Sequence, residues 1–173
     1  MNATTWKAAL AGAYVLIAGA AAWSVAGFER TLAAGQVVLV ELAPVDPRSL
    51  MQGDYMALRF EVDRHLREKI GGSMRQWRDP APPPAYAYLA LDAQRRATLA
   101  GVGDRLPAPA GQVAMRIRVR HNSPSVGPNA FFFQEGTASA YEGAKWGEFR
   151  VAPNGKALLT HLRDGALAQI KPP

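Results

Sequence analysis

Cysteine is absent from the chain, which excludes disulfide bonds, cysteine nucleophiles and zinc sites built on thiolates. Histidine is scarce, with only His65, His121 and His161, so a metal-dependent enzyme would have to hold its metal mainly through carboxylates. A phosphate-binding loop is also missing, because Gly71-Gly72 lacks the Lys-Ser/Thr pair of a P-loop. These absences predict no metal and no cofactor, and they favour a binding or structural role over catalysis.

The overall composition is that of a folded chain with a basic surplus. Its 173 residues suffice for one compact domain with an accessory segment. Hydrophobic residues make up 49%, which excludes a disordered chain, because such chains bury too little apolar surface to offset the entropy lost on folding. The formal net charge is +6. Nucleic-acid binding would need a cytoplasmic domain and a platform of stacking aromatics, so no nucleic-acid partner is expected.

One hydrophobic segment is long enough to cross a membrane. Ala8–Phe28 contains 21 residues without a charged side chain, between Lys7 on one side and Glu29 and Arg30 on the other. As a helix with a rise of about 1.5 Å per residue it would measure roughly 31 Å, close to the thickness of the bilayer hydrocarbon. The predicted organisation is an N-terminal tail over residues 1–7, a transmembrane signal-anchor helix over 8–28 and an extracytoplasmic domain over 29–173.

Three interpretations of this segment stay open, of which a buried helix of a soluble protein is the least favoured. A secretory signal would be cleaved after Ala26, but the apolar core of such signals usually runs 7–15 residues and this one is longer. A signal anchor would remain in the membrane and tether the domain. Because Lys7 is the positive flank, the positive-inside rule places the N-terminus in the cytoplasm and the domain outside it.

The remainder of the chain shows the period-2 alternation of β-strands. Tyr55–Val62 and Gln112–His121 both alternate apolar and polar residues, and the second segment is expected to point Val119 inward. Asn154-Gly155 predicts a tight hairpin, and the segments 86–91 and 97–102 predict a second hairpin around a turn at Asp92–Arg96. Helix is scarce: 138–146 predicts one short helix, whereas Gly71-Gly72 predicts a broken helix or loop within 63–79. We predict a mainly β fold of seven or eight short strands, arranged as a sandwich or a partly open barrel.

The most distinctive motif is the octapeptide Gly53–Phe60, with the sequence GDYMALRF. It resembles the signature of the GDYXXLXY family, a group of uncharacterised membrane-anchored bacterial proteins. The match holds at Gly53, Asp54, Tyr55 and Leu58, whereas Phe60 replaces the final tyrosine. The resemblance implies no established activity. It does imply a multi-pass membrane protein as partner. It also implies that the chain lies in the bacterial inner membrane as a single-pass protein, with its C-terminal domain in the periplasm.

The motif residues have a structural interpretation. Gly53 is expected to close a turn that needs a positive φ. Asp54 is expected to point toward the core at the start of the strand and to accept hydrogen bonds from loop N–H groups. Tyr55 is expected on the opposite face, while Leu58 and Phe60 share the inward parity.

Two further sets of residues form the candidate interaction surface. Arg116, Arg118 and Arg120 are expected on one outward strand face, where they could bind lipid phosphates, another anion or an acidic partner, or simply pair with neighbouring carboxylates. Phe133, Gln134 and Glu135 form the second set, within the segment 132–136 that also resembles the family.

The sequence therefore favours a membrane-anchored, non-catalytic accessory or binding protein of the cell envelope. The alternative is a hydrolase-like enzyme that uses Asp54 and Glu135 as a pair of carboxylates in an envelope-facing cleft. A type I signal peptidase is disfavoured, because Val45 stands at the offset of the serine nucleophile before Gly53.

Overall fold

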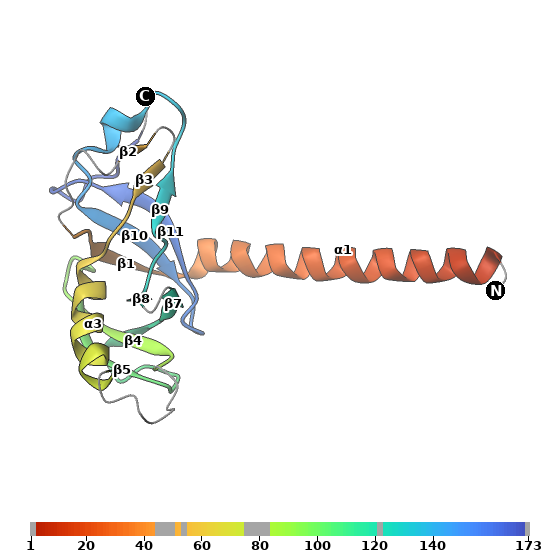
Figure 1. The fold of residues 1–173 in the computed structure, drawn as a ribbon, viewed down its shortest axis with the longest axis horizontal. Coiled ribbons are helices and arrows are strands. Elements are labelled where there is room, and N and C mark those ends of the chain that lie inside the picture. Colours follow the sequence, from red (N-terminus) through yellow and green to blue (C-terminus); the bar gives the residue numbers. More distant parts are fainter. Residues whose placement is uncertain (1–2, 44–50, 53–54, 75–83, 121–122, 172–173) are drawn as a thin grey trace.

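The computed structural model describes residues 3–43, 51–52, 55–74, 84–120 and 123–171. A long helix, α1 (Ala3–Ala34), projects from one side of a domain built mostly of short antiparallel strands (Figure 1). The remaining elements are β1 (Gln36–Glu41), β2 (Met51–Gln52), β3 (Tyr55–Ala57), α3 (Glu61–Met74), β4 (Tyr86–Leu91), β5 (Ala97–Gly103), β6 (Gln112–Arg116), β7 (Arg118–Arg120), β8 (Ser123–Ser125), β9 (Ala130–Phe132), the 3-10 helix η1 (Ala138–Tyr141), β10 (Trp146–Val151) and β11 (Ala157–Arg163).

The apolar length of α1 is not covered by the domain. Leu10–Ala34 is long and apolar enough to cross a membrane, and none of its most hydrophobic window is buried by the rest of the described chain. Only the last turns contact the domain, where Thr31 is buried. A single residue, Gly35, separates α1 from β1, which leads away from the helix (Figure 1).

The sheet next to α1 has the order β1-β10-β11. β1 pairs with β10 from Gln36↔Val151 to Glu41↔Trp146, and its apolar residues Val38 and Val40 are fully buried. The Asn-Gly hairpin between β10 and β11 is confirmed: Gly155 has φ +78°, and a Cβ at this position would lie 2.7 Å from the Tyr86 ring. Glycine is therefore required at this turn both by conformation and by space.

A second sheet has the order β5-β4-β6, and the predicted hairpin of β4 and β5 is confirmed. Figure 1 shows this sheet on the α3 side of the domain. Ala87, Leu89 and Met115 are fully buried and join the residues of β1 and β10 in one hydrophobic core.

Both of the longest predicted strands end early. Tyr55–Val62 forms only the three residues of β3 before α3 begins at Glu61, although Leu58 and Phe60 are buried as expected. Gln112–His121 is interrupted at Ile117, whose N–H donates to the carbonyl of Ala85. The prediction that Val119 points inward is wrong, since its side chain is 42% exposed in the separate two-stranded sheet β7-β8.

The expectation of a broken helix after the motif is also wrong. α3 is continuous over 14 residues, and Val62, Leu66 and Ile70 repeat at helical spacing and are all buried. Gly71 and Gly72 fall in its last turn, where the cost of glycine in a helix is small compared with the burial of the apolar side.

The prediction of a barrel is wrong as well. The strands that the structure describes lie in four separate antiparallel sheets, and no closed barrel joins them. With α1, α3 and η1 the fold is mixed α/β: one long apolar helix, one shorter helix and several small sheets around a shared core. The strand content and the apolar N-terminal helix agree with the sequence, whereas the arrangement of the strands does not.

Candidate functional site

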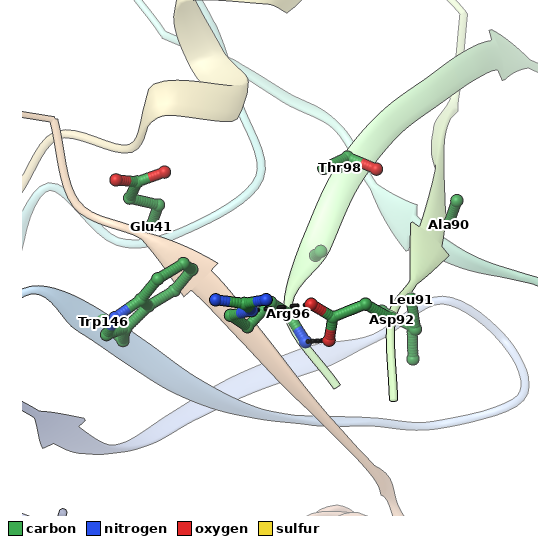
Figure 2. Close-up of a pocket in the computed structure, with 8 residues that line it drawn as sticks. Glu41, Ala90, Leu91, Asp92, Arg96, Thr98 and Trp146 are labelled. Atoms are coloured by element: carbon green, nitrogen blue, oxygen red, sulfur yellow. Dashed lines mark hydrogen bonds and ion pairs between the residues drawn. The ribbon is translucent and has the colours of Figure 1, made fainter. Parts of the chain in front are cut away.

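A pocket of about 370 Å³ lies where the β4–β5 turn meets the edge of the first sheet (Figure 2). It is far from α1, because β1 leads away from the helix and Glu41 is its last residue. At about 3.3 Å per residue, β1 spans roughly 17 Å. The residues that line the pocket are Glu41, Ala90, Leu91, Asp92, Arg96, Ala97, Thr98 and Trp146.

The pocket exists because the β4–β5 turn docks onto β1. Arg95 adopts φ +64°, unusual for a residue with a side chain. Its carbonyl accepts the N–H of Leu39 at 2.9 Å, and Leu39 and Arg96 form an isolated β-bridge. The strained turn residue therefore joins the two sheets at this point.

Arg96 occupies the centre of the pocket, between an acid and an aromatic ring (Figure 2). Its Nε donates to Asp92 Oδ2 at 2.6 Å, and its guanidinium carbon lies 6.0 Å from the centre of the Trp146 ring. Asp92 also accepts the backbone N–H groups of Arg96 at 2.9 Å and Gln94 at 2.8 Å. These hydrogen bonds lower the pKa of Asp92 below its usual value, and the backbone N–H of Arg96 has the largest effect.

The pocket combines charged side chains with an aromatic ring. Asp92 is already saturated by donors, and Glu41 contributes a second carboxylate on the strand that pairs with Trp146. Two carboxylates and one guanidinium leave a net charge of −1, which favours a cationic or neutral polar group over an anion. Among the residues that the structure describes, no group of three His, Asp or Glu side chains could hold a metal ion.

Of the motif residues, two are buried, two lie outside the described residues, and Tyr55 lies partly exposed on β3. Leu58 and Phe60 belong to the hydrophobic core. The Phe60 ring packs edge-on to Phe149, with ring centres 5.4 Å apart, and lies against the backbone of Gly127, where a Cβ would come within 2.4 Å of it. Gly53 and Asp54 lie outside the described residues, and so does most of the loop before them. Their predicted roles stay predictions.

Tyr55 lies on β3, paired with Phe132 of β9 in a small sheet of order β2-β3-β9. The two ring centres are 5.8 Å apart, and Phe132 is 75% exposed. Phe133 is half-buried and stacks on Tyr141 at 5.1 Å.

Gln134 and Glu135 are both exposed and begin the turn that leads into η1. The carbonyl of Gln134 accepts both the N–H and the hydroxyl of Thr137. Whether Glu135 meets Asp54, as the enzymatic alternative requires, lies outside what the structure describes.

The three arginines of the candidate surface are exposed but do not share one strand. Arg116 ends β6 and stands over the Tyr86 ring, with its guanidinium carbon 6.0 Å from the ring centre. Arg118 and Arg120 lie on β7, which pairs with β8 instead of β4. The structure thus places Arg116 in one sheet and the other two in the next.

These features can now be compared with known proteins. A family model described as GDYXXLXY protein matches residues 17–162, from the middle of α1 almost to the end of β11. The chain belongs to the GDYXXLXY family. No curated protein and no solved structure matches it.

The GDYXXLXY match includes the whole pocket and the buried motif residues. Sequence reasoning missed the pocket, because Glu41, Asp92, Arg96 and Trp146 come from distant positions. The one usable signal was local: Asp92 begins a predicted turn, as aspartate often does when it accepts backbone N–H groups.

Sequence reasoning also missed a buried acid beside the GDYXXLXY motif. Asp63 lies in the first turn of α3, where its Oδ1 accepts the Val126 N–H at 2.9 Å and its Oδ2 accepts the Ser125 hydroxyl at 2.7 Å. Burial raises the pKa of Asp63 above its ordinary value, although these two hydrogen bonds act in the opposite direction. This carboxylate fastens α3 to β8.

The raised pKa predicts how Asp63 affects stability with pH. Folding favours the protonated form, so the contribution of Asp63 is complete below the unfolded-state pKa of 3.8 and is lost as the pH rises through the folded-state pKa. We expect the melting temperature of the native chain, relative to an Asp63→Asn variant that cannot ionise, to fall as the pH rises from 3 toward 7. Thermal unfolding of both proteins across this range tests it. A relative melting temperature that rises with pH would show that the hydrogen bonds outweigh burial.

Proposed function

We propose that this GDYXXLXY protein is a single-pass, membrane-anchored binding protein of the bacterial cell envelope, with its domain on the periplasmic side. It works as a non-catalytic accessory of an integral, multi-pass membrane partner. The observation that carries the proposal is the uncovered apolar helix α1, joined to β1 by one residue.

The exposure of α1 supports a membrane environment. Tyr14, Leu16, Ile17 and Trp23 are each more than 70% exposed along it. Burying an apolar side chain stabilises it by about 1.5–3 kcal/mol of free energy relative to water. Contact with a bilayer or a partner helix would supply this stabilisation to the row. Because the domain itself covers none of the most hydrophobic window, the apolar surface must meet lipid or another protein.

The junction with the domain supports a retained anchor over a cleaved signal. Cleavage after Ala26 would cut α1 while it is still helical, eight residues before it ends at Ala34. Beyond that position Thr31 is buried, its hydroxyl donates to the carbonyl of Gly27 within the helix, and the Phe28 ring lies 5.4 Å from Lys156 Nζ of the β10–β11 turn.

The distal pocket supports a binding role. It lies at the end of the domain away from α1 and presents Glu41, Arg96 and the Trp146 ring, a combination that suits a polar or cationic side chain of a partner. Aromatic rings and arginine are enriched among the residues that contribute most to protein interfaces. A partner in the same membrane could reach this end through its own periplasmic loops.

The proposal predicts both membrane retention and orientation. A periplasm-dependent reporter fused after Pro173 is expected to be active, and the fusion is expected to stay in the membrane pellet after alkaline extraction. A cytoplasm-dependent reporter at the same position serves as the control and is expected to be inactive. Release of a shortened chain into the soluble periplasmic fraction would support the cleaved signal, and activity of the cytoplasmic reporter would overturn the location.

A further inference from the structure

The hairpin turn between β10 and β11 lies beside α1 at the level where the apolar segment ends. Phe28 is the last residue of the uncharged stretch, and the next two residues are Glu29 and Arg30. Lys156, in this turn, places its Nζ 5.4 Å from the centre of the Phe28 ring. If α1 spans the membrane, the Lys156 ammonium therefore lies at the boundary between hydrocarbon and headgroups.

The junction of helix and sheet fixes this position. The Gly35 N–H donates to the carbonyl of Thr31 at 2.9 Å, which continues the helical hydrogen bonding, and Gln36 already pairs with Val151. The Gly35 backbone also packs closely against Arg150, since a Cβ on Gly35 would lie 3.1 Å from the Arg150 Cβ. No flexible linker separates the anchor from the domain, so one end of the domain must face the bilayer.

A second cation adjoins the hairpin turn. The Arg116 N–H donates to the carbonyl of Gly155 at 2.8 Å, and the ring of Tyr86 packs against Gly155. Arg118 and Arg120 follow on β7, which lies toward the α1 side of the domain in Figure 1, and all three arginines are exposed.

We propose that this basic end of the domain, defined by Lys156 and Arg116, binds the headgroups of anionic phospholipids. The inference rests on the proposed membrane span of α1. Lysine and arginine at such a level extend their ammonium and guanidinium groups toward lipid phosphates while their methylene stems stay on apolar surface. The Lys156 ammonium lies at this level, over the Phe28 ring. Each cation near an anionic membrane surface increases the ratio of membrane-bound to unbound domain about fivefold. Glu29, the acid next to Phe28 in the sequence, offsets part of this charge.

The absence of cysteine makes a direct test possible. A single cysteine at Pro153, exposed in the hairpin turn, is labelled with an environment-sensitive fluorophore in the full chain and reconstituted in nanodiscs. Ala93→Cys, in the exposed β4–β5 turn beside the distal pocket, is the matched control. We expect headgroup spin-labelled lipid to quench the Pro153→Cys label several-fold more than the Ala93→Cys label. Equal quenching at both positions would overturn the inference.

Charge dependence identifies the headgroup as the binding partner. Quenching at Pro153→Cys is expected to increase several-fold when phosphatidylglycerol replaces half of the phosphatidylcholine, and to lose this increase when Lys156→Gln and Arg116→Gln are added. Lys69→Gln, a lysine on α3 whose Nζ donates to the carbonyl of Ala100, is the control substitution and should leave it unchanged. Quenching that is indifferent to lipid charge would refute the proposal.

A third label separates this inference from the proposed span. Leu16→Cys, in the middle of α1, is expected to be quenched by lipid spin-labelled deep in the acyl chain. If Leu16→Cys is quenched while Pro153→Cys is not, α1 spans the bilayer and only the headgroup contact is wrong. If Leu16→Cys is not quenched, both the span and the headgroup contact are wrong.

Discussion

Replacing Phe60 with alanine is expected to lower the free energy of unfolding by about 3–5 kcal/mol, the range typical of a fully buried phenylalanine. The ring is 2% exposed, packs against Phe149 and lies on the backbone of Gly127 and Gly147. Removing it leaves a cavity that two glycines, which have no side chains to move, cannot fill. Urea unfolding of the full chain in detergent, followed by circular dichroism, measures the change.

Phe132→Ala is the matched control. It deletes the same side chain from a position that is 75% exposed, so its effect is expected to stay within about 0.5 kcal/mol. If both variants lose stability equally, or if Phe60→Ala unfolds like the native protein, the buried role of the motif is wrong. A loss confined to Phe60→Ala assigns the end of the motif to the core.

This result would also explain how Phe60 can stand where the family signature has tyrosine. The ring fills a space bounded by apolar groups and glycine backbone, in which its area and shape supply the stabilisation. The part of the motif that the structure describes therefore contributes packing at Leu58 and Phe60, whereas Tyr55 belongs to the more exposed pair with Phe132.

Local signals in the sequence predicted local structure well. Asn154-Gly155 and the turn at Asp92 each connect strands that are adjacent in the chain, so turn chemistry alone sets the pairing of β10 with β11 and of β4 with β5. The uncharged length of Ala8–Phe28 likewise predicted a helix without any knowledge of its neighbours.

The same reasoning failed where a distant element decides the structure. Val62 continues the alternation of β3, so the sequence pattern predicts a strand at this residue. It lies in α3 instead, because Val62, Leu66 and Ile70 form an apolar helical face that packs in the core. Val119 continues the alternation of β6, yet the chain changes sheets at Ile117. Period-2 alternation does not reveal a change of sheet, since the backbone can leave one sheet without disturbing the pattern.

The pocket was unpredictable for a related reason. Its acid, guanidinium and aromatic ring come from β1, the β4–β5 turn and β10, and they meet only because the carbonyl of Arg95 accepts the Leu39 N–H. A positive φ at an arginine has no signature in the sequence, since glycine and asparagine are the residues that usually signal it.

A buried ion pair near the C-terminal end of the fold carries the second large prediction. Glu148 on β10 is 4% exposed, and its Oε2 accepts the Arg163 Nε at 2.6 Å. Arg163 also donates through Nη1 to the carbonyl of Leu167 at 2.5 Å. His161 Nδ1 is buried 3.9 Å from Glu148 Oε1 without a hydrogen-bond partner among the described residues. Arg163 is thus the main donor that compensates the buried carboxylate.

Arg163→Gln is therefore expected to lower the free energy of unfolding by about 3 kcal/mol, because it leaves the Glu148 carboxylate buried and uncompensated. Arg64→Gln is the matched control: Arg64 pairs with Glu61 on the exposed side of α3, and such helical surface pairs contribute no more than about 0.5 kcal/mol. Urea unfolding in detergent distinguishes the two variants.

A double variant shows whether the charge or the packing of Arg163 is responsible. Adding Glu148→Gln to Arg163→Gln removes the uncompensated buried charge, so it is expected to recover at least half of the lost stability. If the double variant is less stable than Arg163→Gln alone, the arginine stabilises the strand through its packing and its hydrogen bond to Leu167, and the ion pair is secondary.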